Sequence, residues 1–448
     1  MTFKSALDID CGIRYMYDNL CIISSCGRKL LLDSTMMTTR RHIEAHHSRL
    51  NDIYDKEYKT IMGKLMYIKD IHNTINRLDN GVILDDIEFF EIKHLAIISD
   101  EIRHILNEQH ITAVNLPTLH KVVEILDPDN LNIPSFYIYD SYSDTLRELR
   151  KQVKALQGNG AELPEEHRLQ LASLQQQCAD VELEIREKLS QALQQYAPLL
   201  QEALHNLSRL DLLIAQVEQI KQLGLCIPTF TQDGNTYYKG MFNPAVKDYL
   251  SQQGKEYMPV DISFGNEAVC IIGANMGGKS VALKTLALNQ LLAQYGFGVA
   301  AQECCINVVE EIALCIGDEQ NIAKGISSFA AEILAINKVI QGIRAGKNIL
   351  ALIDEPARTT NPIEGTALVE GLLQVISHNK GGFILTTHYN IKNNTIKRYK
   401  VKGLKDGVMD YTLVETHCGD VPHEAIAIAQ SLGIDTLWIE YTKSKLNN

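Results

Sequence analysis

The sequence lacks the features of a secreted or membrane-spanning protein. No apolar run follows a basic N-terminal segment, and no stretch approaches the roughly eighteen uninterrupted apolar residues of a membrane span. The ten cysteines form no Cys-x-x-Cys pair and have no histidine at zinc-ligand spacing, which argues against a zinc finger or a disulfide framework. We therefore expect a reduced, cytoplasmic protein, with the adjacent Cys304 and Cys305 packed as core residues rather than acting as a redox pair.

An excess of basic residues is missing as well. The formal net charge is −12, and residues 251–448 carry 17 Lys and Arg against 20 Asp and Glu. Proteins that hold a phosphate backbone by charge normally show a basic face. The excess of acidic residues counts against strong nonspecific nucleic-acid binding. It does not exclude a local basic patch.

The N-terminal half is predicted to be helical. At 448 residues and 45% hydrophobic composition, the chain is long enough for two or three domains. Apolar side chains recur at three-to-four spacing through residues 41–126, and a similar stripe continues from Leu163 to Leu223, where Pro198 should kink or split the helix and Gly224 should end it. With a helix over Ser143–Gln157, this predicts a lever hairpin over about 143–223, or equally an ordinary helical bundle.

The C-terminal half changes to buried strands that alternate with helices, which is typical of an α/β layer. The strand Ala268–Ile272 leads into a glycine-rich turn and then a helix from Val281 to Tyr295, the context that a phosphate-binding loop requires. Lys279 is expected to reach the β- and γ-phosphates of a nucleotide and Ser280 to ligate magnesium. The residues expected to contact the nucleotide are Gly273, Ala274, Asn275, Met276, Gly277, Gly278, Lys279, Ser280 and Val281.

Two further strands are predicted to bring polar groups to the same sheet edge. The apolar run Asn348–Ile353 ends in Asp354 and Glu355; the first suits a magnesium ligand and the second a general base for the attacking water. The strand Gly382–Leu385 is followed at His388 by an imidazole that can hydrogen-bond the γ-phosphate or the water. Glu355 and His388 are the candidate catalytic residues, and Asp354 joins Ser280 as a candidate magnesium ligand.

A capping-type sequence lies between these strands. Gly325 is followed by Ser327, Ser328 and Phe329 at the expected start of a helix. Alone it indicates only a helix cap. In ATPases whose sites form between two subunits, such a helix start supplies γ-phosphate contacts from the opposite chain.

Together these motifs resemble the MutS family of ABC-type ATPases. The loop Gly273–Ser280 is similar to the family's Gly-Pro-Asn-Met-Gly-Gly-Lys-Ser, with Ala274 in place of proline. The acidic segment with Thr360-Asn361-Pro362 and the Thr-Thr-His-Tyr that contains His388 resemble the branch of paralogues that often carries a Smr nuclease domain. The resemblance implies an N-terminal segment at 1–40, a helical core at 41–250 and a P-loop ATPase domain at 251–448. It also implies that Tyr257 stacks on adenine, with a core tyrosine as the alternative.

The same resemblance implies a cofactor set and a dimer. We expect ATP and Mg²⁺, a homodimer or a heterodimer with a MutS-like paralogue, and helical arms moved by ATP turnover. We expect no mismatch reading, since no reader domain precedes the helical core. Two cargoes are expected: a distorted or branched DNA, or a metabolic enzyme such as a cobalamin-dependent lysine aminomutase, because short MutS-like proteins of this kind are encoded beside such enzymes.

Overall fold

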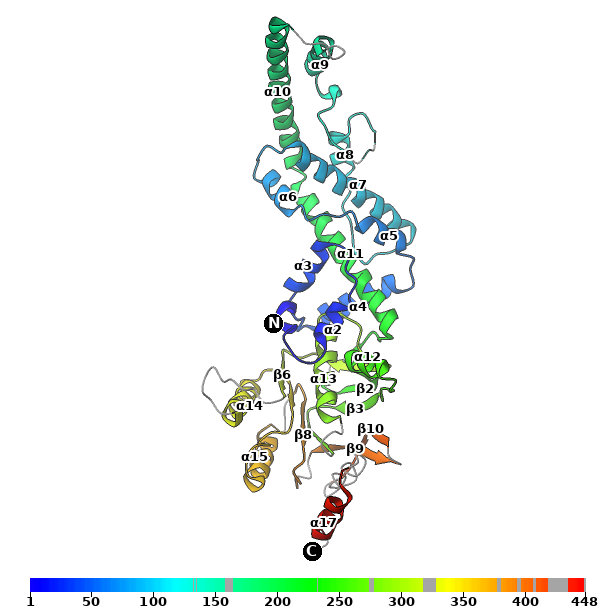
Figure 1. Ribbon diagram of the computed structural model, residues 1–448, viewed down its shortest axis with the longest axis vertical. Helices are drawn as coiled ribbons and strands as arrows, with labels where there is room; N and C mark the ends of the chain where they lie inside the picture. The colour runs from blue at the N-terminus through cyan, green and yellow to red at the C-terminus, as the bar shows by residue number, and fades with distance from the viewer. Residues whose placement is uncertain are drawn as a thin grey trace. The chain divides into compact units, whose positions relative to one another are not determined.

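The computed structural model describes the chain except for residues 132, 134, 158–163, 232, 274–277, 317–327, 377–379, 393–395, 406, 407, 418–433, 447 and 448. It divides into two compact units, which are described separately (Figure 1). Unit 1 comprises Met1–Cys21, Asp33–Ser48 and Gln216–Asn448, and unit 2 comprises Ile22–Leu32 and Arg49–Ala215. One of the divisions falls inside a long helix, α11 (Ala197–Leu223), between Ala215 and Gln216.

Unit 2 is built from helices. The long α7 begins at a capping box in which the Asp85 side chain accepts from the Glu88 backbone N–H and the Glu88 side chain accepts in return, so both ends of the exchange satisfy free donors. The described helices of this unit are α3 (Ser25–Asp33), α5 (Lys59–Leu65), α6 (His72–Asp79), α7 (Asp86–Glu108), α8 (His120–Leu126), the 3-10 helix η1 (Asp140–Tyr142), α9 (Asp144–Gln157), α10 (Glu165–Gln194) and the first part of α11 (Ala197–Leu223).

The expected long apolar stripe forms two helices instead of one. The break between α10 and α11 falls just before Pro198, which lacks an amide proton and so fits the first turn of a helix but not its interior. Gly224 follows α11 at φ 66°, as a glycine at the end of a helix commonly does. Helix α9 packs along α10, where Arg150 donates to Glu182 over 2.8 Å. These features confirm the predicted split, helix end and pairing.

Unit 1 contains two sheets among its described residues. In the larger, the strand order is β10-β9-β4-β8-β7-β6, with β9, β4, β8, β7 and β6 parallel and β10 antiparallel to β9. In the smaller, the order is β1-β5-β2-β3. The strands are β1 (Thr229–Thr231), β2 (Thr236–Met241), β3 (Val260–Phe264), β4 (Ala268–Ile272), β5 (Glu303–Asn307), β6 (Glu311–Cys315), β7 (Ile349–Ile353), β8 (Phe383–Thr387), β9 (Lys397–Lys405) and β10 (Val408–Glu415).

Helices cover both faces of the larger sheet. Alternate residues of β7, namely Ile349, Ala351 and Ile353, share a buried cluster with residues of α14 and α15, while Leu350 and Leu352 are equally buried toward the other face, which α13 contacts. The helices of unit 1 are α1 (Phe3–Ala6), α2 (Ile13–Asp18), α4 (Arg40–Tyr54, shared at its end with unit 2), α12 (Pro244–Gln252), α13 (Lys279–Gln294), α14 (Ser328–Arg344), α15 (Pro362–Val375) and α17 (Thr436–Leu446).

The N-terminal residues belong to the core of unit 1. The Phe3 ring lies fully buried, with its centroid 5.0 Å from the Tyr295 ring and 5.6 Å from the Phe297 ring. The Tyr295 hydroxyl donates to the Met1 carbonyl over 2.9 Å. The first helices therefore anchor the end of α13, the helix that begins at the expected phosphate loop.

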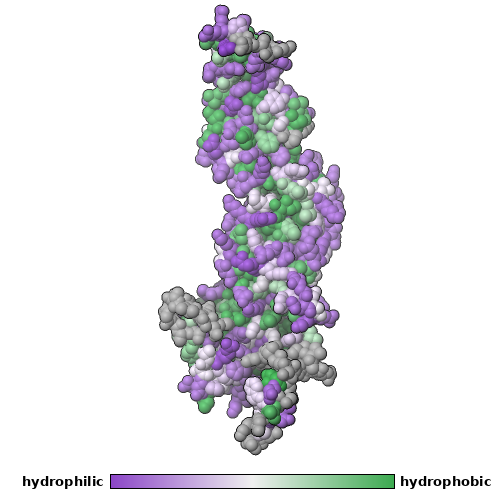
Figure 2. Space-filling model, in the orientation of Figure 1, coloured by the Kyte–Doolittle hydropathy of each residue, from purple (hydrophilic) through white to green (hydrophobic). Residues whose placement is uncertain are grey.

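The visible surface is mainly hydrophilic, with apolar side chains scattered over it (Figure 2). The exposed apolar residues Met66, Leu169 and Ile363 lie after the end of α5, on α10 and on α15, respectively. None of the described helices combines the length and the apolar character that crossing a membrane requires.

Candidate functional site

Three strands of the larger sheet end at one edge. β4 pairs with β8 in parallel, with Ile272 opposite Thr387, and β7 pairs with the other side of β8. Gly273, Asp354 and His388 follow these strands directly. Because the carboxyl ends of adjacent parallel strands meet at the same edge, this is where an open α/β sheet collects ligand-binding groups.

The helix α13 begins at this edge. Its N-cap is Gly278 at φ 75°, in the left-handed region that a side chain disfavours. A Cβ atom added there would lie 3.1 Å from Cδ1 of Tyr411, so a glycine also leaves room for that ring. Lys279 and Ser280 form the first turn, where unpaired backbone N–H groups and the helix dipole favour an anion. The expected contacts at Ala274, Asn275, Met276 and Gly277 lie outside the described residues.

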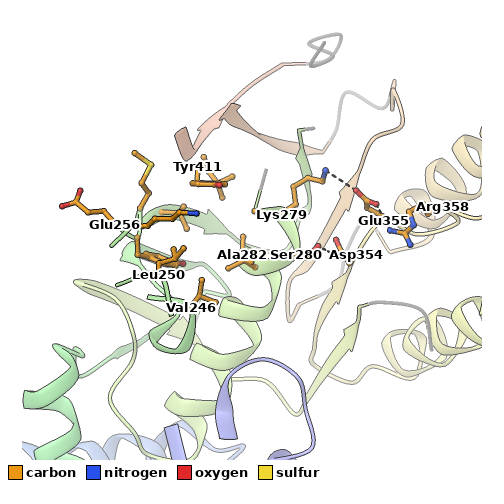
Figure 3. A pocket seen from close by; sticks show the side chains of 17 residues that line it. Val246, Leu250, Glu256, Lys279, Ser280, Ala282, Asp354, Glu355, Arg358 and Tyr411 are labelled. Carbon is orange, nitrogen blue, oxygen red and sulfur yellow. Dashed lines mark hydrogen bonds and ion pairs between the residues drawn. The ribbon is translucent and has the colours of Figure 1, made fainter. Parts of the chain in front are cut away.

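The Lys279 ammonium is held inside the site by two acceptors. Its Nζ donates to the Gly273 carbonyl over 2.7 Å and lies 3.2 Å from Oε1 of Glu355 (Figure 3). The side chains of Lys279 and Glu355 are only 4% and 12% exposed. A buried ammonium needs a negative partner, and here the carboxylate expected to serve as general base fills that place.

A second acid faces the first turn of α13. Asp354 Oδ2 accepts a hydrogen bond from Ser280 Oγ over 2.5 Å, and its Oδ1 accepts one from Thr386 Oγ1. Magnesium prefers oxygen ligands such as a carboxylate and a hydroxyl. The adjacent Ser280 and Asp354 oxygens therefore fit a bound magnesium ion, as the sequence predicted for this pair.

The backbone after β7 is strained and firmly held. Glu355 and Ala357 adopt φ values of 44° and 62°, a region that is costly for residues with a Cβ atom. The Glu355 N–H donates to Thr386 Oγ1 over 2.9 Å, the Ala357 N–H donates to Glu332 Oε1 over 2.9 Å, and the Tyr389 hydroxyl donates to the Ala357 carbonyl over 2.8 Å. These contacts fix the direction in which the Glu355 carboxylate leaves the strand.

Gly278, Lys279, Ser280, Asp354 and Glu355 line a pocket of about 900 Å³. One wall is polar and contains Lys279, Ser280, Asp354 and Glu355; the other is mostly apolar (Figure 3). The apolar wall is formed by Val246, Leu250, Tyr257, Met258, Tyr411 and Leu413. A pocket with charged groups at one end and aromatic and aliphatic side chains at the other suits a ligand that joins an anionic part to a flat apolar one.

Two tyrosines of this wall differ in hydrogen bonding and exposure. The Tyr257 hydroxyl accepts a hydrogen bond from the Asn243 backbone N–H over 3.2 Å, and burial raises the pKa of the phenol. Tyr411 is 38% exposed and lies against the start of α13. Both rings line the pocket, so either can contact a flat ligand there.

Several predicted residues lie elsewhere. His388 is exposed at the end of β8, with its ring centroid 4.3 Å from that of Tyr389, and it is not among the described residues that line the pocket. Of the capping-type sequence, Gly325 and Ser327 lie outside the described residues, as does the side chain of Ser328. The backbone of Ser328 begins α14, and Phe329 is half-buried in its first turn. Contacts of these residues with a nucleotide stay predictions.

Sequence reasoning assigned no role to three residues that the structure brings to the site. The Thr386 hydroxyl donates to the Asp354 carboxylate and accepts from the Glu355 backbone N–H. Thr386 lies in the Thr-Thr-His-Tyr segment, and that motif was the sequence signal that could have pointed to it. Arg358 lines the pocket with Nη1 3.7 Å from Oε2 of Glu355, three residues along the acidic segment. Tyr411 arrives on the β9–β10 hairpin, far along the chain, and no local pattern marks it.

Residues 269–419 match the family model of MutS domain V. The chain is 30% identical over 252 residues to the endonuclease MutS2 of Caldanaerobacter subterraneus subsp. tengcongensis, which covers 54% of this chain and 30% of that protein. It is 30% identical over 265 residues to the endonuclease MutS2 of Agathobacter rectalis, covering 56% and 32%.

A similar match reaches the DNA mismatch repair protein MutS of Shouchella clausii, 30% identical over 196 residues and covering 44% of this chain and 22% of that protein. These matches confirm the resemblance to the MutS family that the motifs indicated. The chain spans about a third or less of the length of these curated relatives, so their whole activities are not thereby those of this chain.

Proposed function

We propose that this MutS-family protein binds ATP in the pocket at the start of α13 and hydrolyses it. The observation that carries the proposal is the convergence of Lys279, Ser280, Asp354 and Glu355 on one 900 Å³ pocket. Lys279 would contact the β- and γ-phosphates, and Glu355 would accept a proton from the attacking water. Ser280 and Asp354 would hold a magnesium ion, which supplies positive charge next to the phosphates when bound.

The ion pair between Lys279 and Glu355 bears on how a nucleotide would bind. The Lys279 ammonium lies 3.2 Å from the Glu355 carboxylate. Phosphate oxygens compete for the same ammonium, so binding would release Glu355 to face the water. The strained backbone at Glu355, held through Thr386, keeps the carboxylate at the sheet edge during this exchange.

The remaining roles follow the family resemblance. Tyr257 would stack on adenine, and His388 would hydrogen-bond the γ-phosphate or the attacking water once the nucleotide is in place. Two copies, or this chain and a MutS-like paralogue, would face each other so that Gly325, Ser327, Ser328 and Phe329 of one reach the nucleotide of the other. ATP binding would bring the subunits together and move their helical arms, and hydrolysis would release them.

Two cargoes are proposed, each on its own observation. DNA is favoured by the similarity to an endonuclease MutS2 and to a DNA mismatch repair protein MutS. The charge of the helical arm favours a protein partner, because residues 151–221 contain 7 Lys and Arg against 10 Asp and Glu, and a phosphate backbone would be repelled by that balance. In neither case do we propose mismatch reading.

The ATPase proposal is tested by phosphate release from MgATP and by nucleotide binding. The Lys279→Ala variant should lose nucleotide binding, because it removes the cation that faces the phosphates, and chelation of magnesium should stop phosphate release. Magnesium-independent phosphate release, or unchanged binding by a folded Lys279→Ala variant, would overturn the assignment. Gel-shift titrations with duplex, branched and single-stranded DNA at several salt concentrations then decide between the cargoes: tight, salt-sensitive binding supports DNA, and its absence together with a specific co-purifying enzyme supports the protein partner.

A further inference from the structure

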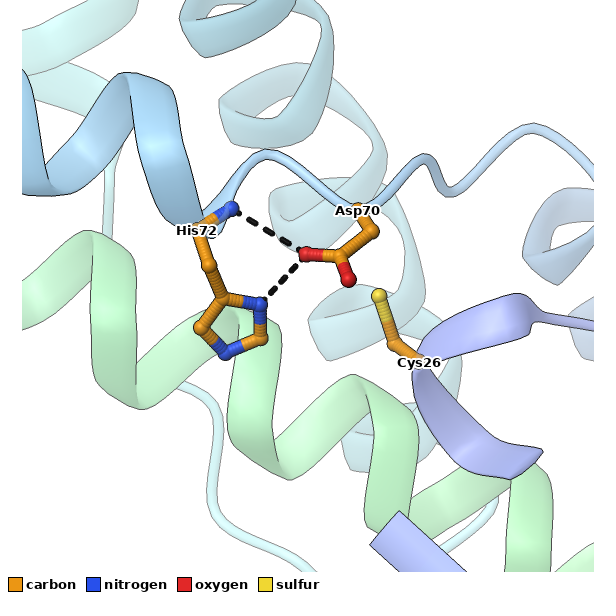
Figure 4. A group of neighbouring side chains, drawn as sticks. All are labelled: Cys26, Asp70 and His72. Carbon is orange, nitrogen blue, oxygen red and sulfur yellow. Dashed lines mark hydrogen bonds and ion pairs between the residues drawn. The ribbon is translucent and has the colours of Figure 1, made fainter. Parts of the chain in front are cut away.

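Three potential metal ligands meet in unit 2, apart from the nucleotide pocket. Cys26 lies on α3, Asp70 in the connection between α5 and α6, and His72 in the first turn of α6 (Figure 4). A sulfur, a carboxylate oxygen and a ring nitrogen of these residues all lie within 4.8 Å of one another. Cys26 and His72 are 46 positions apart in the sequence, so no local spacing announces the cluster.

The Asp70 carboxylate is already oriented toward the cluster. Its Oδ1 accepts a hydrogen bond from the His72 backbone N–H over 3.2 Å and lies 2.6 Å from His72 Nδ1. In Figure 4 its second oxygen lies on the side of the Cys26 sulfur. Cys26 is 3% exposed, whereas the Asp70 and His72 side chains are 33% and 45% exposed, so an ion can reach the cluster from solvent while the thiol is shielded.

The donor set matches zinc better than the ions of the nucleotide site. Thiolate, imidazole and carboxylate are the ligands that Zn²⁺ takes in proteins, whereas Mg²⁺ takes oxygens. Tetrahedral bonds of about 2.0–2.3 Å place neighbouring ligand atoms roughly 3.3–3.8 Å apart. The longest separation here, at most 4.8 Å, therefore needs to shorten by about 1 Å, and the 2.6 Å contact between Asp70 Oδ1 and His72 Nδ1 needs to lengthen by about as much when both atoms bind the ion. Rotation of the exposed His72 and Asp70 side chains can supply both changes.

One cation stands near the cluster. Lys29 Nζ lies 4.0 Å from Asp70 Oδ2, and its side chain is 64% exposed. Such a pair contributes little in water, and the flexible lysine can swing away when a divalent ion takes its place. The charges therefore permit an ion at the carboxylate without removal of a buried partner.

We propose that Cys26, Asp70 and His72 form a zinc site with a water molecule in the fourth position. The bound ion would fasten α3 to the connection between α5 and α6, two segments that are distant in the sequence. Helix α3 is the short piece of the N-terminal region that belongs to unit 2, since the residues on both sides of it belong to unit 1. Zinc would thus stabilise unit 2 at the point where the chain enters and leaves it.

Cobalt titration tests the site without reference to ATP turnover. Metal-free protein is titrated with Co²⁺ alone, and thiolate ligation is followed by its near-ultraviolet charge-transfer absorption. We expect one equivalent to bind with this absorption, Zn²⁺ to displace it, and Zn²⁺ to raise the Tm. Cys26→Ser should abolish the absorption, and His72→Ala should weaken Co²⁺ binding at least 10-fold and remove the Tm rise.

Matched controls come from the same unit. Cys178→Ser on α10 and His104→Ala on α7 should bind Co²⁺ like the parent. Circular dichroism checks that each variant is folded. Asp70→Asn keeps the thiolate and so its absorption, but it should weaken Co²⁺ binding at least 10-fold, and it tests the site if Cys26→Ser does not fold. An absorption that survives in folded Cys26→Ser, an unchanged Co²⁺ affinity in folded Asp70→Asn, or no uptake of Co²⁺ by the parent protein would overturn the site while leaving the ATPase proposal untouched.

Discussion

Replacing Glu355 by glutamine should separate nucleotide binding from hydrolysis and should tighten binding. The carboxylate lies 3.2 Å from Lys279 Nζ, so it would compete with a phosphate oxygen for this ammonium. A hydrogen bond to a charged group contributes about 1.5–3 kcal/mol. The glutamine amide keeps a hydrogen bond from the charged ammonium but loses the attraction between opposite charges, so we expect Glu355→Gln to weaken the competing contact by about 1–1.5 kcal/mol, which corresponds to roughly 5- to 10-fold tighter nucleotide binding.

Hydrolysis should change in the opposite direction. A general base contributes about 10²- to 10⁴-fold to a rate, so kcat should fall at least 100-fold. Binding is measured by calorimetry with a non-hydrolysable ATP analogue and Mg²⁺, and hydrolysis by phosphate release. Glu256→Gln is the matched control, because Glu256 is an exposed residue on the opposite part of the same pocket, and it should change neither quantity more than 2-fold or so.

The two readouts can refute different parts of the reasoning. A folded Glu355→Gln variant that hydrolyses ATP at the parent rate would exclude Glu355 as the base. Weaker binding of the analogue by this variant, with hydrolysis lost, would mean that the ion pair with Lys279 does not compete with phosphate. Either outcome would leave the fold unchanged.

Three further predictions address neighbouring contacts. Tyr411→Ala should weaken nucleotide binding about 5- to 100-fold if the Tyr411 ring stacks on the base, since aromatic stacking on a base contributes roughly 1–3 kcal/mol. Calorimetry on Tyr411→Ala and Tyr257→Ala identifies which ring stacks, and an unchanged affinity in Tyr411→Ala excludes the Tyr411 ring. Thr386→Val should lower kcat about 10-fold with little change in KM, because it removes the hydroxyl that joins Asp354 to the Glu355 N–H; Thr387→Val is the neighbouring control, and an unaltered kcat in Thr386→Val contradicts the role. Burial lowers the pKa of His47 to about 3, so below about pH 6.5 the unfolded state binds more protons than the folded state. The free energy of unfolding should therefore fall as the pH drops, by about 2 kcal/mol between pH 6.5 and 5. Urea unfolding should show a smaller loss of stability in His47→Gln than in the parent protein, and equal losses would refute the role given to His47.

Much of the architecture was predictable because its signals are local. Helix and strand periodicity depends on neighbours within one or two turns, and it located β4 to the residue and the break before Pro198. The phosphate-loop pattern carries its own context of strand, glycines and helix, and the acids after β7 follow a single buried strand. Charges near these motifs could be given roles without knowing any distant contact.

Other features could not be predicted because they join distant segments. The sequence offered no packing partner for residues 1–40. In the structure the Phe3 ring contacts the rings of Tyr295 and Phe297 in unit 1. A short apolar helix has no pattern that says which surface buries it. For the same reason Tyr411 was not assigned to the pocket.

The sequence by itself determined the three strands that end at the candidate site, the split of the long helical stripe at Pro198, the lysine, serine and acids proposed to bind ATP, and the likeness to the MutS family. The tertiary structure alone decided that Glu355 neutralises Lys279, that Thr386 joins the two acids, and that Cys26 meets Asp70 and His72. The first group follows from interactions along a few consecutive residues. The second depends on chain segments folding back on one another, where side-chain burial and packing choose partners that no spacing in the sequence records.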